Sequence, residues 1–343
     1  MDDLTEILRQ CVLKNASDLH LVSNEFPRMR LLGELLVLDN LDKDVFSEKQ
    51  IIELISPFCL KEGINLEELK LLKKEMDFSF AIKDIGRFRV NIFQQSFGIS
   101  VAIRILSNQI PSFESLGLSK TIKEFILNQN HGLILVTGAT GSGKSTTLAS
   151  IINEINQFKR KHILTLEDPI EFYHQSNNCL IQQRQIKHHT QSFQSALKAA
   201  LREDPDIILI GELRDLDSIR LALEASETGH LVLATLHTNS AIKSIDRIIQ
   251  VFGEKEKNQI RMMLSESLKM VISQQLINLD KKSRKAVFEI LMVDAAVSNL
   301  IRENKLVQIN SVIETNKKKG MQTMNQALKE IDKSFNQIKQ AIF

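Results

Sequence analysis

The chain has 343 residues, of which 43% are hydrophobic and 25% are charged. These values are typical of folded globular domains, so they exclude a wholly disordered chain, and the length suffices for roughly two or three domains. The 44 Lys and Arg residues nearly balance the 42 Asp and Glu residues, which gives a net charge of +2. This balance excludes a surface that is basic throughout, as a bulk nucleic-acid binder would need.

Three cysteines, Cys11, Cys59 and Cys179, lie far apart in the chain. Their odd number and spacing exclude a disulfide framework and a CxxC zinc site. The acidic start MDDLTEIL predicts no secretory signal, and no apolar run approaches the ~18 residues that span a bilayer. The sequence therefore predicts a cytoplasmic protein without a membrane span.

Residues 1–107 are predicted to form a small mixed α/β domain. Apolar residues at helical spacing predict a helix over 4–12, and alternating segments predict strands at 18–22 and 28–32. Further helices are expected at 48–55 and 66–74, and further strands at 78–80, 86–92 and 100–105. The pattern loosens around Pro111 and Gly117, so residues 108–120 are interpreted as a linker.

Residues 121–343 have a different pattern. Short apolar runs at 133–136, 207–210 and 231–236 do not alternate, which is typical of strands that are covered on both faces. Such strands, with helical patterns between them, predict a mainly parallel sheet with crossover helices. After an apolar segment at 288–292, the chain is expected to be helical to its end, with this helical part starting at about 293.

The strongest motif is GATGSGKS at 138–145, which matches the phosphate-binding pattern G-x-x-x-x-G-K-[ST]. Glycines let backbone N–H groups wrap closely around an anion, and the helix that opens at Lys144 would point its positive end at phosphate. Lys144 is expected to reach the β- and γ-phosphates of a nucleotide, and the hydroxyl of Ser145 to bind Mg²⁺. The residues predicted to contact the nucleotide are Gly138, Ala139, Thr140, Gly141, Ser142, Gly143, Lys144, Ser145 and Thr146. The alternative is a structural glycine-rich turn, but an apolar strand precedes the motif and a helical pattern follows it, as a phosphate loop requires.

Acidic residues follow two of the predicted strands in the same domain. Glu212 comes after the run at 207–210, and Glu167 and Asp168 end a short strand that starts at residue 162. At a phosphate site, one carboxylate can orient the attacking water and another can help to hold the metal shell. Each acid alone has an equally good alternative as a solvated charge, but two acid-tipped strands beside one phosphate loop favour hydrolysis.

His237 follows the predicted strand at 231–236. A donor at that strand end could sense the γ-phosphate, and the alternative is a histidine that is hydrogen-bonded for structural reasons only.

Four segments in this order resemble the motifs of the type II/IV secretion ATPase superfamily. GATGSGKST resembles its Walker A motif, LEDPIEF its Asp box, LREDPDIILIGELRD its Walker B motif and ETGHLVLATLHTNSA its His box. The segments ASDLHL, GRFRVNIF, SIDRII, MLSESLKMVISQQL and GMQT extend the resemblance over nearly the whole chain. Within the superfamily, the chain is most similar to the retraction ATPases of type IV pili, which drive twitching motility.

The resemblance implies a fold and an assembly. It implies an N-terminal PAS-like α+β domain, a C-terminal RecA-like P-loop ATPase domain, and a homohexameric ring of such subunits. It also implies ATP and Mg²⁺ as cofactors, and a cytoplasmic motor that acts on the inner-membrane platform protein at the pilus base, with no direct contact with nucleic acid.

By motif match, the resemblance also assigns residues. Glu212 is matched to the catalytic Walker B carboxylate, Glu167 to an Asp-box acid near the attacking water, and His230 and His237 to the His box. Superfamily members complete the site with arginines of the N-terminal domain, and the matching segments carry Arg87, Arg89 and Arg104. Together with Lys144, these residues form the expected catalytic set.

One position departs from the retraction ATPases. They usually carry the segment AIRNLIRE, whereas residues 296–303 read AVSNLIRE, with Ser298 in the place of an arginine. The departure does not affect the expected ATPase activity, but it weakens the link to pilus disassembly and leaves open a retraction-type ATPase that serves a secretion apparatus.

Three other functions are less consistent with the sequence. Pilus-extension and secretion ATPases usually carry a four-cysteine zinc insertion and a longer N-terminal region, and this chain has no CxxC motif. A RecA-like nucleic-acid motor would need aromatic residues for base stacking, and the chain has no Trp and one Tyr. A scaffold that binds nucleotide without hydrolysing it would not need both Glu167 and Glu212.

Overall fold

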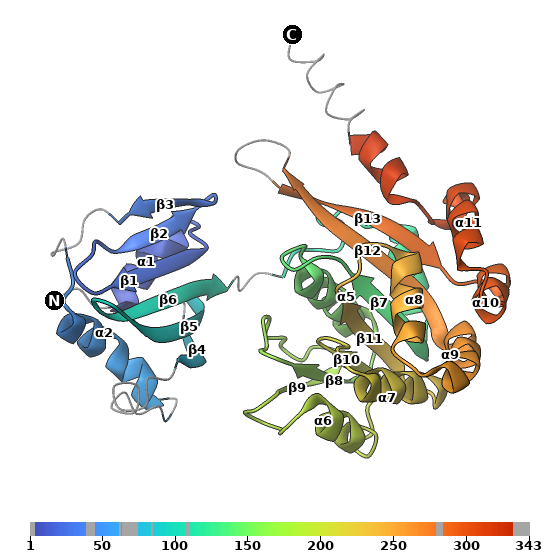
Figure 1. The fold of residues 1–343 in the computed structure, drawn as a ribbon, viewed down its shortest axis with the longest axis horizontal. Helices are drawn as coiled ribbons and strands as arrows, with labels where there is room; N and C mark the ends of the chain where they lie inside the picture. The colour runs from blue at the N-terminus through green and yellow to red at the C-terminus, as the bar shows by residue number, and fades with distance from the viewer. Residues whose placement is uncertain are drawn as a thin grey trace, which may run out of the picture. The chain divides into compact units, whose positions relative to one another are not determined.

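The computed structural model describes residues 4–38, 45–61, 63, 75–83, 85–106, 110–278 and 284–331. The chain divides into two units, Met1–Gln109 and Ile110–Phe343 (Figure 1). Each unit has its own cluster of buried apolar side chains. The helix that the sequence predicts at 66–74 lies outside the described residues.

The first unit contains an antiparallel sheet with the strand order β3-β2-β1-β6-β5-β4. Its strands are β1 (Asp18–Val22), β2 (Arg28–Leu31), β3 (Glu34–Val37), β4 (Met76–Ile82), β5 (Gly86–Gln95) and β6 (Gly98–Leu106). Two helices, α1 (Leu4–Leu13) and α2 (Glu48–Lys61), place their apolar sides in the same core as the sheet.

Alternation along the strands explains why only one face of this sheet is packed. In β5, the side chains of Phe88, Val90 and Ile92 are buried in the core, whereas Arg89 is exposed on the opposite face. A period of two is what places alternate side chains on opposite faces of a strand. The helices therefore cover the apolar face, and the other face carries the polar residues.

The second unit contains a sheet with the strand order β13-β12-β7-β11-β10-β8-β9. Its strands are β7 (Gly132–Thr137), β8 (His162–Glu167), β9 (Leu180–Gln185), β10 (Ile207–Ile210), β11 (Leu231–Leu236), β12 (Leu268–Asn278) and β13 (Arg284–Met292). The described helices are α4 (Lys120–Leu127), α5 (Lys144–Phe158), α6 (Phe193–Ala200), α7 (Leu216–Glu227), α8 (Ala241–Gln250), α9 (Glu254–Ser267), α10 (Ala295–Arg302) and α11 (Ile309–Thr315), with the short 3-10 helices η1 (Leu306–Gln308) and η2 (Lys317–Lys319).

The expected mainly parallel sheet is confirmed. The strands from β12 to β9 pair in parallel, and only β13 runs antiparallel to its described neighbour, β12. Every residue of β7, β10 and β11 is buried, because helices cover both faces of the sheet's centre. Parallel pairing brings the carboxyl ends of β7, β8, β10 and β11 to one edge, which is where ligands bind in open α/β sheets.

Strand β12 was not predicted from the sequence. Its apolar run is interrupted by Ser273, Gln274 and Gln275, yet the first two of these are fully buried. The predicted helical end of the chain is correct for α10 and α11, and helical residues recur at 324–331. Between them, however, Gln322 pairs with Ile290 of β13 as an isolated bridge, so the C-terminal part is not wholly helical.

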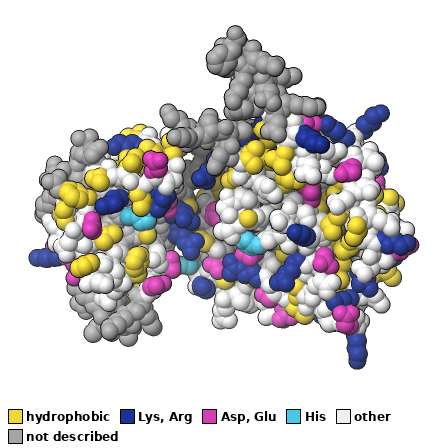
Figure 2. All heavy atoms as spheres, turned by 45° about the horizontal axis from the view of Figure 1, so that its top comes forward, with side chains coloured by type: hydrophobic (Ala, Val, Ile, Leu, Met, Phe, Trp, Pro, Cys, Tyr) yellow, Lys and Arg dark blue, Asp and Glu magenta, His cyan; other side chains and the backbone are white. Residues whose placement is uncertain are grey.

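The face of the molecule drawn in Figure 2 carries interspersed basic and acidic side chains over the second unit. This mixture agrees with the nearly balanced charge of the chain.

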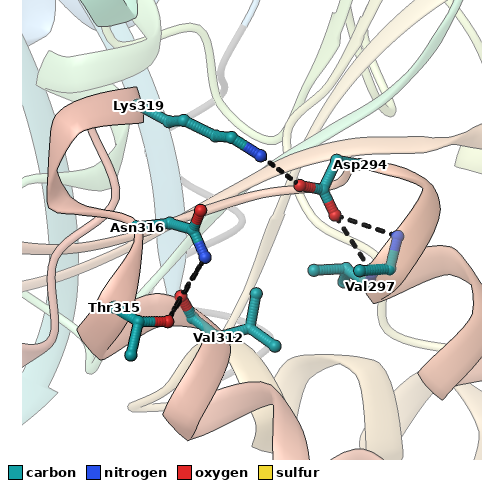
Figure 3. A network of polar contacts seen from close by, with 7 residues as sticks. Asp294, Val297, Val312, Thr315, Asn316 and Lys319 are labelled. Atoms are coloured by element: carbon teal, nitrogen blue, oxygen red, sulfur yellow. Dashed lines mark hydrogen bonds and ion pairs between the residues drawn. The ribbon is translucent and has the colours of Figure 1, made fainter.

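A polar network fixes the start of α10 (Figure 3). The Asp294 carboxylate accepts hydrogen bonds from the backbone N–H groups of Ala296 and Val297, at 3.1 and 3.2 Å, and therefore caps the helix. Its other oxygen accepts from Lys319 Nζ at 2.8 Å. Nearby, Asn316 and Thr315 both donate to the carbonyl of Val312, which closes the end of α11.

We expect Asp294→Ala to lower the free energy of unfolding of the second unit by about 1 kcal/mol, since the α10 cap is lost. Lys319→Met should cost less, because Lys319 is mostly exposed and its ion pair is screened by solvent. The pKa of Asp294 is lowered, and the largest cause is its hydrogen bond from Lys319. The contribution of this carboxylate is therefore present above its unfolded pKa and is lost as the pH falls through the lowered folded value. Denaturant unfolding of both variants at neutral and acidic pH measures these free energies. An equal loss of unfolding free energy in the two variants would contradict the capping role.

Candidate active site

The phosphate loop leaves the central strand β7 and enters α5 at Lys144. A Cβ atom on Gly138 would lie 2.4 Å from the carbonyl oxygen of Gln274, so only glycine fits there. Gly143 precedes the helix with φ of 90°, a left-handed conformation that favours glycine. The loop thus turns tightly onto the first turn of a 15-residue helix, whose free N–H groups form an anion site.

Lys144 lies at the centre of this loop. Its side chain is 9% exposed, and Nζ donates to the carbonyls of Gly138 and Ala139 at 2.9 and 3.1 Å. Burial lowers the pKa of Lys144, and the negative charges of Glu212 and Glu171 oppose this effect. Both acids therefore act on the charge of the ammonium group.

Glu212, two residues past the end of β10, is held from both sides. His237 Nε2 lies 3.2 Å from one carboxylate oxygen, and Arg214 Nη2 lies 2.8 Å from the other. His237 Nδ1 in turn lies 3.3 Å from the hydroxyl of Thr140 in the phosphate loop. His237 Nε2 can donate to Glu212 while Nδ1 contacts the Thr140 hydroxyl, so one imidazole links the loop to the acid.

Glu167 and Glu212 have opposite environments. Burial raises the pKa of Glu167, although Thr165 and Gln183 donate to its carboxylate at 2.6 and 3.3 Å. Burial also acts to raise the pKa of Glu212, but the hydrogen bond from Arg214 and the charge of His237 outweigh it and lower the pKa. Glu212 therefore stays ionised to lower pH than Glu167 does, and two carboxylates with diverging pKa values are suited to different roles in a reaction.

Glu171 is a further acid of this site, and it was not predicted from the sequence. It lies four residues after Glu167 in the segment LEDPIEF, and its charge acts on both Lys144 and Glu167. The available signal was a third acid in a segment whose first two acids were already singled out. Because Glu171 does not follow directly after a strand, the sequence pattern gave no geometric reason to place it among the site residues.

The structure does not bring all predicted residues together. His230 precedes β11, and Leu231 pairs with Gly132 at the start of β7, so His230 lies at the edge opposite the phosphate loop. There its Nδ1 is 3.1 Å from the carbonyl oxygen of Ala225. The position of His237 at the other end of the same strand explains its contact with Thr140.

The three candidate arginines belong to the first unit. Arg89 of β5 and Arg104 of β6 are directly opposite each other and exposed, whereas Arg87 of β5 is buried. Arg104 Nε also forms an ion pair with Asp18 at 3.1 Å. Among the described residues, Arg89 has no ion-pair or hydrogen-bond partner.

A phosphate loop at the end of a central parallel strand, with acids at the neighbouring strand ends, defines a P-loop ATPase domain. A family model described as "Type II/IV secretion system protein" matches residues 1–342, and the chain belongs to this family.

Relatives of both units are known. The type IV pilus retraction ATPase PilT of Pseudomonas aeruginosa is 46% identical over 328 residues, which cover 95% of this chain and 93% of the relative. A twitching motility protein of Neisseria gonorrhoeae is 53% identical over 258 residues, which cover 75% of this chain and 69% of the relative. The crystal structure of the pilus retraction motor PilT with bound ADP has a TM-score of 0.88 and 41% identity, and it covers 97% of this chain and 94% of that one.

These similarities confirm the resemblance and the α/β fold class that the sequence predicted, and they confirm a nucleotide-binding ATPase. Within the described part of the chain, none of the helices has the length and apolar character to cross a bilayer.

We expect Glu212→Gln to retain nucleotide binding and to lower the rate of ATP hydrolysis by roughly 10²–10⁴-fold, because the carboxylate that orients water is lost while the loop is intact. Lys144→Ala should instead weaken nucleotide binding. Phosphate release and ADP titration measure the two effects. Glu256→Gln is the matched control, since it removes a carboxylate that pairs with Arg220 on a different part of the unit. Wild-type turnover by Glu212→Gln would move the catalytic role to Glu167 or Glu171.

Proposed function

We propose that this protein is the ATP-hydrolysing motor that retracts a type IV pilus by withdrawing pilin subunits at the pilus base. The observation that carries the proposal is the similarity to PilT over both units, at 46% identity and 95% of the chain. A fold alone would support only an ATPase, since one fold serves many functions.

The residues of the site support a specific division of chemistry. The loop N–H groups and Lys144 bind the phosphates of ATP, and Glu212 orients the attacking water while His237 and Arg214 hold its carboxylate. Glu167, whose pKa is raised mainly by burial, is suited to receive a proton from that water. Each of these residues lies at the carboxyl edge of the sheet.

Mg²⁺ is the proposed metal. The hydroxyl of Ser145 in the first turn of α5 and the carboxylate of Glu212 are hard oxygen donors of the kind that this ion prefers, so the residues present fit it. Ser145 is the residue that would hold the ion directly, and the ion would supply charge to balance the γ-phosphate. Among the described residues, no group of three or more His, Cys, Asp or Glu side chains is arranged as a metal site.

The proposed partners follow from the same similarity. The motor is a cytoplasmic homohexamer that acts on the inner-membrane platform protein of the pilus machinery. A retraction-type ATPase of a secretion apparatus is the second candidate. It is favoured by Ser298, which replaces the expected arginine on α10, outside the elements that carry the phosphate loop and its acids.

Deletion of the gene separates these functions. Cells that are hyperpiliated and unable to twitch support retraction, and their motility should return with the wild-type gene but not with the Glu212→Gln variant. Bald cells would indicate pilus extension, and normal pili with impaired export would indicate the secretion role.

An arginine from a neighbouring subunit is proposed to complete each site. The N-terminal unit offers Arg89, which is exposed and has no ion pair with any described residue, whereas Arg104 is paired with Asp18 and Arg87 is buried. A trans arginine contributes roughly 10³–10⁵-fold to the rate in related NTPases. We therefore expect Arg89→Ala to bind ATP and hydrolyse it poorly.

Mixed rings test this sharing of sites. Rings assembled from Arg89→Ala and Glu212→Gln subunits should regain activity, because some sites then combine an intact Glu212 with a neighbour's Arg89. Rings built from subunits with both changes and subunits with Glu212→Gln alone should stay inactive, because no subunit then has Glu212. Arg28→Ala, on strand β2, is the control for removing an exposed arginine of the same sheet. A monomeric ATPase unit as active as the full ring would exclude a trans arginine.

A further inference from the structure

A buried glutamine on β12 contacts the phosphate loop. Gln274 is 1% exposed, and its Nε2 donates to the carbonyl oxygen of Ser142 at 2.6 Å. β7 ends opposite Ser273, where Thr137 pairs with it, so Gln274 lies beside the first residue of the loop, Gly138. The glutamine therefore contacts the loop at two places, beside its first residue, Gly138, and at the carbonyl of Ser142.

The hydrogen bond fixes one peptide group of the loop. In a trans peptide the C=O and N–H bonds point in opposite directions, because the group is planar. When the Ser142 carbonyl points at Gln274, the N–H group of Gly143 must point away from β12. Gly143 is the last glycine before Lys144, and its N–H is one of the donors that the phosphate-loop pattern supplies to a nucleotide.

We propose that Gln274 is a positioning residue of the nucleotide site: its Nε2 holds the Ser142 carbonyl so that the Gly143 N–H group is presented to phosphate. The proposal rests on the phosphate-binding role of the loop and adds a residue that no motif of the loop contains.

The surroundings of Gln274 argue against a purely space-filling role. Its other amide atom, Oε1, is buried without a hydrogen-bond partner among the described residues, and the same holds for the hydroxyl of Ser142. An unsatisfied buried polar atom destabilises a fold. A methionine would fill similar volume at this position without that cost, so the hydrogen bond to Ser142 is what distinguishes the glutamine from an apolar residue here.

The contact between Gln274 and the loop also leaves little room for a side chain at position 143. A Cβ atom on Gly143 would lie 3.2 Å from Gln274 Nε2, which is tighter than ordinary contact. Glycine at position 143 thus serves both its left-handed φ of 90° and the close approach of the glutamine.

Two variants of the full-length protein test the proposal, with ADP in the presence of Mg²⁺ as the probe. Gln274→Met keeps the volume and removes the donor, and we expect about tenfold weaker ADP binding, as for the loss of one hydrogen bond. Because the Gly143 N–H group contacts phosphate before and during the reaction, KM for ATP should rise with little change in kcat.

Gln274→Glu should make ADP binding depend on pH, which a purely structural role of Gln274 would not predict. A protonated glutamic acid can donate to the Ser142 carbonyl, whereas the ionised carboxylate repels it. Since burial raises the pKa of a carboxyl group, this change falls within an accessible pH range. ADP affinity relative to the wild type should therefore recover as the pH falls in Gln274→Glu and stay uniformly low in Gln274→Met.

Gln275→Met is the matched control, because Gln275 is the next residue of the strand and is exposed. It should bind ADP like the wild type at every pH. Wild-type affinity in Gln274→Met, or a flat pH response in Gln274→Glu, would overturn the proposal, and the second variant decides the matter if the first does not fold. Failure of the wild-type protein to bind ADP would instead exclude the phosphate-binding role itself.

Discussion

Parallel pairing of β7, β8, β10 and β11 is the constraint on which the site depends. Their register brings Thr137 of β7 beside Leu236 of β11, and Leu166 of β8 beside Ile210 of β10. The residues that follow these strand ends must then share one edge. Because the strands themselves are buried on both faces, polar groups needed for chemistry have no other place near the centre of the sheet. The phosphate loop, Glu167, Glu212 and His237 follow from this single arrangement.

Charge balance then decides how the acids at that edge behave. Lys144 is desolvated, and the nearby Glu212 and Glu171 stabilise its charge. Arg214 and His237 keep Glu212 ionised, whereas Glu167 is surrounded by neutral donors and its burial raises its pKa. Similar residues at neighbouring strand ends thus acquire different properties from their contacts, and a carboxylate that stays ionised differs in use from one that takes up a proton.

Much of this site was predictable because its chemistry is local in sequence. Close approach to phosphate requires glycines at fixed spacing, and acids at the ends of buried strands are visible as apolar runs followed by a charge. The features that were missed depend on contacts over long separations. Gln274 binds a residue 132 positions away, and in the sequence it only interrupts the apolar run of β12. The shared motif also did not indicate that His230 and His237 lie apart. A strand of six residues separates them, so they lie at opposite edges of the sheet.

The β12–β13 hairpin connects the nucleotide site to the C-terminal helices. Gln274 of β12 binds the phosphate loop, and Glu289 of β13, opposite Ser273, accepts a hydrogen bond from the first N–H group of α8 at 2.7 Å. β13 continues through Met292 to Asp294, which caps α10. A displacement of the loop therefore breaks the bond between Gln274 and Ser142, moves the Gln274 side chain, or moves β12. β12 is paired with β13 from Met270 to Asn278, so a movement of β12 without loss of pairing carries the start of α10 with it. In a motor of this family, that connection offers a physical route by which the state of the loop and the position of the helix that carries Ser298 depend on each other.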